Sequence, residues 1–178
     1  KYTEKGSVTL NVNYEKEDAT HIILKISVKD TGIGIKEEDI EKLFSVSLSR
    51  LRTDYIDFYL MHNVSSFAQW ESLKAAGVEE WIAEKKAAGQ IKNVGFSYHG
   101  SLPDFKKIIE DYSWDFCQIQ YNYAGETYQA GREGLQFASR HGLPVIIMEP
   151  LLGGRLATKL PKRAQDEFVK YSGSKPVE

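Results

Sequence analysis

From residue 54 onwards, strand-like and helix-like segments alternate along the sequence, and this alternation limits the folds that the chain can adopt. Short apolar runs are separated by longer stretches in which apolar residues recur every three or four positions. Because strands joined through helices pair in parallel, the pattern predicts βαβ units with right-handed crossovers. The predicted strands are 55–62, 91–97, 116–121 and 144–148, and the predicted helices are 72–88, 103–111, 129–141 and 163–171.

The segment before residue 54 has a different pattern. Residues 7–15 and 21–30 alternate between apolar and polar positions, and a polar turn at 16–20 separates them, which predicts an antiparallel hairpin. A helix is predicted over 36–52, with apolar positions spaced by three or four residues from Ile40 to Leu51. The acidic residues in its first turn suit the positive end of the helix dipole.

We expect these segments to form one α/β fold in which the helix joins the hairpin to the parallel strands. The predicted sheet is mixed and six-stranded, with residues 21–30 lying beside residues 55–62. Six strands cannot close an eight-stranded barrel, so the sheet should resemble an open half of a (β/α)8 barrel. Such a sheet exposes apolar surface and free edges, and we therefore predict a homodimer that covers them.

Composition excludes several classes of protein. The formal charge of −2 argues against nucleic acid or an anionic membrane as an electrostatic partner. No apolar run approaches the ~20 residues that a membrane-spanning helix needs, and the single cysteine, Cys117, cannot form an intrachain disulfide. Cys117 lies in an apolar strand and is predicted to be buried. His21, His99 and His141 are not spaced as metal ligands. The expectation is a cytoplasmic protein without a bound metal.

Residues 1–44 contain the motif Asp30-Thr-Gly32-Ile-Gly34 between a predicted strand and a predicted helix. This segment resembles the ATP-binding domain of sensor histidine kinases. The resemblance implies that Asp30 accepts a hydrogen bond from the adenine amino group, and that Gly32 and Gly34 allow close approach of the nucleotide. The magnesium-binding asparagine and the second glycine-rich motif of that family have no match in this chain, so the resemblance implies no productive ATP binding.

From about Ser47 to Phe168 the chain resembles the aldo-keto reductases, which are (β/α)8-barrel enzymes that reduce carbonyl groups with NADPH. The resemblance rests on long segments at 48–62, 89–97, 114–122 and 145–154. It implies that the four predicted strands are strands four to seven of such a barrel.

The same resemblance implies roles for individual residues. His62 matches the catalytic histidine that polarises the substrate carbonyl, and Ser97 and Gln118 match residues that hold the nicotinamide carboxamide. Met148 matches a position where many members place a ring that stacks on the nicotinamide. The proton-donating tyrosine, its lysine and its aspartate belong to earlier strands of the barrel and have no match here. Hydride transfer requires a matched proton donor, so His62 alone should support little turnover.

These observations predict three regions: a histidine-kinase-like fragment at 1–44, a half barrel at 45–171 and a tail at 172–178. The leading hypothesis is a chimeric or recombined protein without native kinase or reductase turnover. One alternative is a degenerate NADPH-binding oxidoreductase of the aldo-keto reductase type that uses Ser97 and Gln118. Another is a weak adenine-nucleotide-binding module that uses Asp30.

Overall fold

The computed structural model describes the backbone of residues 8–16, 22–30 and 37–172, and the side chains of residues 40–170. The chain divides into two compact units, Lys1–Ser47 and Leu48–Glu178.

The first unit contains the predicted hairpin. Strands β1 (Val8–Lys16) and β2 (Ile22–Asp30) are antiparallel, and their register runs from Val8 opposite Asp30 to Lys16 opposite Ile22. Helix α1 (Glu37–Leu51) confirms the helix predicted after the hairpin. Its buried stripe is narrower than its apolar pattern suggested, because Ile40 and Phe44 are buried whereas Leu43 is 53% exposed.

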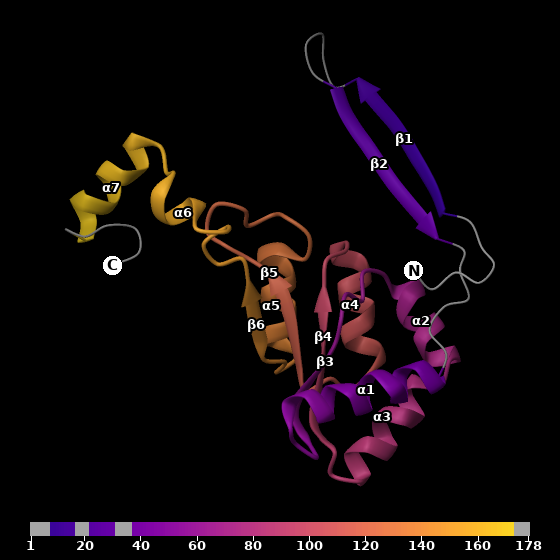
Figure 1. The fold of residues 1–178 in the computed structure, drawn as a ribbon. Helices are drawn as coiled ribbons and strands as arrows, with labels where there is room; N and C mark the ends of the chain where they lie inside the picture. Colours follow the sequence, from indigo (N-terminus) through magenta and orange to yellow (C-terminus); the bar gives the residue numbers. More distant parts are fainter. Residues whose placement is uncertain (1–7, 17–21, 31–36, 173–178) are drawn as a thin grey trace. The chain divides into compact units, whose positions relative to one another are not determined.

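The second unit is built on a parallel sheet, as the alternation of segments predicted. Its strands are β3 (Ile56–Met61), β4 (Ile91–Tyr98), β5 (Phe116–Gln120) and β6 (Val145–Met148), in that spatial order. Successive strands are connected along the chain by helices, which pack against the sheet (Figure 1): α2 (Phe67–Ala75), α3 (Val78–Ala87), α4 (Leu102–Asp111) and α5 (Gly131–Arg140). Helices α6 (Arg155–Thr158) and α7 (Lys162–Ser172) follow the last strand.

The prediction of one six-stranded mixed sheet is wrong for the described strands. These strands form two sheets: β1 pairs with β2, and β3 to β6 form a separate four-stranded parallel sheet. The sequence pattern supplies a reason. Strand β2 carries Lys25, Ser27 and Lys29 on alternate positions, and antiparallel pairs commonly have one apolar face and one polar, solvated face. That pattern suits a hairpin with one solvated face.

The predicted helix at 72–88 is two helices rather than one. Helix α2 ends at Ala75 and α3 begins at Val78, and Gly77 between them has a φ of 83°. This left-handed conformation cannot continue a helix, and glycine adopts it without the steric cost that a Cβ brings. Both helices present a buried face, with Trp70 in α2 and Val78 and Ile82 in α3 fully enclosed.

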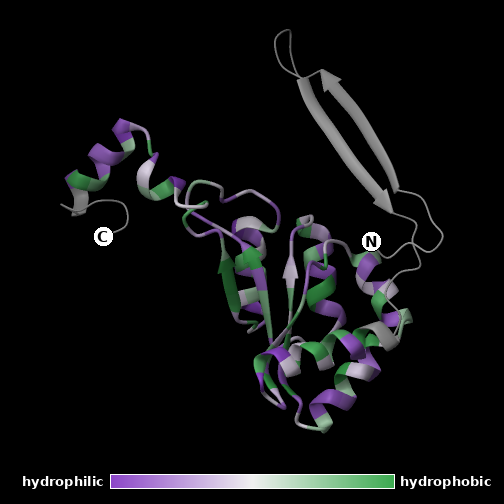
Figure 2. Cartoon of the chain, in the orientation of Figure 1, coloured by the Kyte–Doolittle hydropathy of each residue, from purple (hydrophilic) through white to green (hydrophobic). Residues whose placement is uncertain are grey.

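The sheet of the second unit has two unlike faces. Helices cover the first face, which we call the helix-covered face; its members are Val94, Phe96, Tyr98, Cys117 and Ile119, all with an exposed fraction of 0%. Cross-strand partners in the register place Phe58, Gly95, Ser97, Phe116, Gln118 and Ile146 on the other side, which we call the open face. On the edge strands, Phe58 is 64% exposed and Ile146 is 45% exposed. Figure 2 shows that β6 is hydrophobic along its length.

The core beneath the helix-covered face is an aromatic cluster. The Trp70 ring lies 4.9 Å from Trp114 and 5.5 Å from Tyr112, and Phe96 lies 4.8 Å from Trp114 between ring centroids. The indole N–H of Trp70 donates a hydrogen bond of 2.8 Å to the Asp111 carboxylate, which also pairs with Lys74. The hydrogen bond from the Lys74 ammonium is the main reason that the pKa of Asp111 lies below its usual value. The cluster therefore joins α2, α4 and β4.

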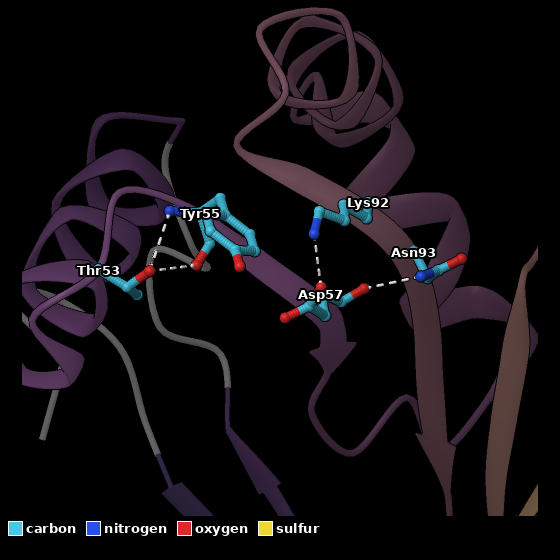
Figure 3. A network of polar contacts seen from close by, with 5 residues as sticks. All are labelled: Thr53, Tyr55, Asp57, Lys92 and Asn93. Carbon is cyan, nitrogen blue, oxygen red and sulfur yellow. Dashed lines mark hydrogen bonds and ion pairs between the residues drawn. The ribbon is translucent and has the colours of Figure 1, made fainter.

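Strands β3 and β4 are also joined by polar contacts near their amino ends (Figure 3). The Lys92 ammonium lies 2.8 Å from the Asp57 carboxylate and 4.0 Å from the centroid of the Tyr55 ring. The Asn93 side-chain amide donates a hydrogen bond of 2.8 Å to the backbone carbonyl of Asp57. The hydrogen bond to Asp57 is the main reason that the pKa of Lys92 is raised. Because both charged side chains are exposed, the ion pair contributes little to stability.

Candidate functional site

The sequence-predicted residues His62, Ser97 and Gln118 gather towards one end of the parallel sheet. His62 directly follows Met61, the last residue of β3, and Met61 lies opposite Phe96 in the register. Ser97 is the next residue of β4, and its partner on β5 is Gln118. The carboxyl ends of parallel strands are where α/β folds bind ligands. The fold therefore brings these three residues to a position that suits a site.

Ser97 is the most constrained of the three residues. Its exposed fraction is 2%, and its hydroxyl oxygen accepts a hydrogen bond of 2.7 Å from the backbone N–H of Asn63. The backbone carbonyl of Ser97 accepts a second hydrogen bond, of 2.9 Å, from the N–H of Val64. Both bonds hold the turn that follows His62.

His62 and Gln118 are less constrained. The side chain of His62 is exposed, and that of Gln118 is half-buried. In the part of the chain that the structure describes, the side-chain amide of Gln118 makes no hydrogen bond. A half-buried amide can both donate and accept, so Gln118 is available to a ligand on the open face.

A small pocket lies beyond Gln118 at the same end of the sheet. It has a volume of about 350 Å³ and is lined by Gln120, Asn122, Ala124, Gly125, Tyr128 and Leu152. Asn122 is 8% exposed. Its side-chain NH2 group donates a hydrogen bond of 3.2 Å to the backbone carbonyl of Glu149, and its side-chain oxygen accepts one of 3.1 Å from the backbone N–H of Ala124. Sequence reasoning missed Gln120 and Asn122. For Gln120 a signal was available: it lies two positions after Gln118, on the same face of a strand that is otherwise apolar.

Met148, the position matched to a stacking ring, is the last residue of β6 and lies opposite Gln120. The thiol of Cys117 is buried as predicted, and its burial raises its pKa to about 12. A thiol with that pKa stays protonated at neutral pH and is a poor nucleophile. Cys117 is therefore a packing residue of the helix-covered face.

The residues predicted for adenine binding have no described side chains, so the structure does not test that prediction. Asp30 is the last residue of β2, where only the backbone is described, and Gly32 and Gly34 lie outside the described residues. His21 also lies outside them. Among the described side chains, no three His, Cys, Asp or Glu residues gather as a metal site would require. No described helix is both long enough and apolar enough to cross a membrane.

The fold and the site are those of half an α/β barrel with a potential ligand site at the carboxyl ends of its strands. The model of the aldo/keto reductase family matches residues 8–171, and the chain belongs to that family. This match begins well before Ser47, where the resemblance recognised from motifs began.

Two further comparisons support the fold. The uncharacterized oxidoreductase YrpG of Bacillus subtilis is 27% identical over 132 residues, which are 72% of this chain and 39% of that protein. The crystal structure of an aldo/keto reductase from Brucella melitensis superposes with a TM-score of 0.55 at 22% identity, covering 79% of this chain and 50% of that one.

A short stretch of the chain also matches hybrid sensor histidine kinases, as the motif at Asp30 indicated. The hybrid signal transduction histidine kinase B of Dictyostelium discoideum is 42% identical over 45 residues, which are 25% of this chain and 2% of that protein. The chain thus spans at most about half the length of each of these three proteins.

Proposed function

We propose that this chain joins a fragment of a histidine kinase ATP-binding domain to the second half of an aldo-keto reductase barrel, and that it lacks native turnover. The observation that carries the proposal is the four-stranded parallel sheet with His62 at its carboxyl end. Strands that would carry the proton-donating tyrosine precede this position in a reductase. Here the preceding residues contain the Asp30 motif and form an antiparallel hairpin.

The chemistry supports the absence of turnover. Reduction of a carbonyl by hydride transfer develops negative charge on oxygen, which a proton donor must neutralise. His62 can polarise a carbonyl, but it has no tyrosine, lysine and aspartate at matched positions beside it. General acid catalysis contributes typically 10²–10⁴-fold to a rate. The half barrel should therefore fall short of a complete reductase by at least about that factor.

The first test is NADPH oxidation with a panel of short-chain aldehydes. We expect the rate to equal the rate without protein, and we expect His62→Ala to leave it unchanged. A rate above background that is lost in His62→Ala would contradict the proposal and indicate an active reductase.

A second candidate function is binding of a nicotinamide nucleotide without turnover. The unpaired amide of Gln118 beside the buried Ser97 favours it, because both side chains can hydrogen-bond a carboxamide. Calorimetric titration with NADPH should then give a binding isotherm that Gln118→Ala abolishes. Gln136→Ala is the matched control, because Gln136 is exposed on α5. ATP titrated in parallel, with Asp30→Asn as its variant, tests the adenine-binding alternative.

We further propose that two copies associate through the open face. Two sets of four parallel strands supply the eight that such a barrel needs, and the exposed Phe58 and Ile146 lie on the two edge strands. Light scattering should give the mass of two chains, and Phe58→Ser should shift it towards one. Val169→Ser, at an apolar position of α7 that is 58% exposed, is the control. A wild-type monomer at all concentrations contradicts the proposal.

A further inference from the structure

The turn after β3 takes an unusual backbone conformation at one position. Asn63 has a φ of 55°, in the left-handed region. A residue with a Cβ is uncommon there, and asparagine tolerates it better than most. Such a conformation persists when the surrounding structure holds it. His62 directly precedes Asn63, so the hydrogen bonds that hold Asn63 also constrain the backbone on the carboxyl side of His62.

Ser97 supplies the hydrogen bonds that hold this turn. Its side-chain oxygen binds the N–H of Asn63 at 2.7 Å, and its backbone oxygen binds the N–H of Val64 at 2.9 Å. The side chain of Val64 is completely buried, which anchors the far side of the turn. Two consecutive amides are thus bound by one residue of the neighbouring strand, whose own exposed fraction is 2%.

We propose that Ser97 is a positioning residue for His62: its hydroxyl fixes the turn at Asn63 and thereby the orientation of the His62 imidazole, with no nucleotide present. This role is separate from any contact that Ser97 makes with a ligand. A hydroxyl has two acceptor lone pairs and one hydrogen. One lone pair is used by Asn63, and the hydrogen stays available to an acceptor. Ser97 has this role whether or not the chain turns over a substrate.

The test compares two neighbouring amides in the absence of nucleotide. In Ser97→Ala the side-chain acceptor is lost while the backbone acceptor remains. Hydrogen exchange at Asn63 should then accelerate on the order of tenfold, the effect of losing one hydrogen bond. Exchange at Val64 should stay close to its wild-type rate, which also shows that the fold is intact. The Cε1–Hε1 resonance of His62 should shift in the same variant.

Three further variants complete the experiment. Ser97→Thr keeps the hydroxyl and should restore both the Asn63 protection and the His62 resonance. If Ser97→Ala does not fold, Ser97→Cys serves instead, since its thiol is a weak acceptor. Ser101→Ala is the matched control, because the Ser101 hydroxyl also accepts from a backbone amide, that of Asp104 in the first turn of α4, and not from Asn63 or Val64. Unchanged Asn63 exchange and an unmoved His62 resonance in folded Ser97→Ala would overturn the proposal.

Discussion

Replacement of Trp70 by alanine is expected to lower the free energy of unfolding of the second unit by about 3–5 kcal/mol. The Trp70 side chain has no exposed surface and packs against Trp114 and Tyr112. Removing it leaves a cavity at the junction of α2 and α4, and the Asp111 carboxylate loses the indole N–H. Since whole domains are stable by only about 5–15 kcal/mol, a large fraction of the variant should be unfolded at moderate urea concentration.

Urea denaturation followed by circular dichroism measures this effect. Trp70→Phe is the matched variant: it keeps an aromatic ring in the core but removes the hydrogen bond to Asp111. We expect it to lose less than half as much stability as Trp70→Ala, because most of the effect comes from the lost ring volume. Equal losses in the two variants would assign the stability to the hydrogen bond instead. A loss below about 1 kcal/mol in Trp70→Ala would mean that the cluster is not the core of the unit.

Gly95→Ala is the second substitution with a large expected effect. A Cβ at Gly95, in the middle of β4, would lie 2.6 Å from the backbone oxygen of Phe116 and 2.7 Å from two carbons of its ring. The Phe116 ring also makes an edge-to-face contact with the Phe58 ring, with a centroid distance of 5.6 Å. The oxygen belongs to the backbone of the adjacent strand, so the clash cannot be relieved by rotating a side chain. We expect a cost of about 2–3 kcal/mol, as for overpacked cores.

Thermal and urea unfolding of Gly95→Ala, beside Gly125→Ala, checks this prediction. A Cβ at Gly125 would meet only the Asn122 side-chain oxygen, at 3.4 Å, so that variant should change stability little. Wild-type stability in Gly95→Ala would mean that β4 and β5 can separate without loss. That outcome would contradict the close approach of the two strands on the open face.

Much of the second unit could be predicted from residue patterns. The alternation of apolar runs with amphipathic stretches located β3 to β6 within a few residues, because period-two and period-3.6 patterns are local properties of a segment. The hairpin at β1 and β2 and the helix α1 were predicted for the same reason. The break at Gly77 was missed, because glycine is tolerated inside a helix and its left-handed conformation depends on how α2 and α3 pack.

The candidate site was predicted in part. His62, Ser97 and Gln118 were recognised through a family resemblance, and the parallel register explains why they lie at one end of the sheet. The hydrogen bonds of Ser97 to the turn at Asn63 had no sequence signal, since they join residues 34 positions apart. Asn122 was missed because its side chain bonds to the backbone groups of Glu149 and Ala124. Almost every residue has such backbone groups, so the identity of the partner residues gives no signal in the sequence.

Residue patterns were sufficient to identify most of the strands and helices, and to show which residues could alternate between two faces of a sheet. The sequence also carried the two family resemblances, since motifs are stretches of adjacent residues. The division of the described strands into two sheets could be read from the strand pairing in the structure and not from the sequence. The reason is that periodicity specifies the faces of a strand but not its neighbour, and pairing depends on groups that are distant in the chain.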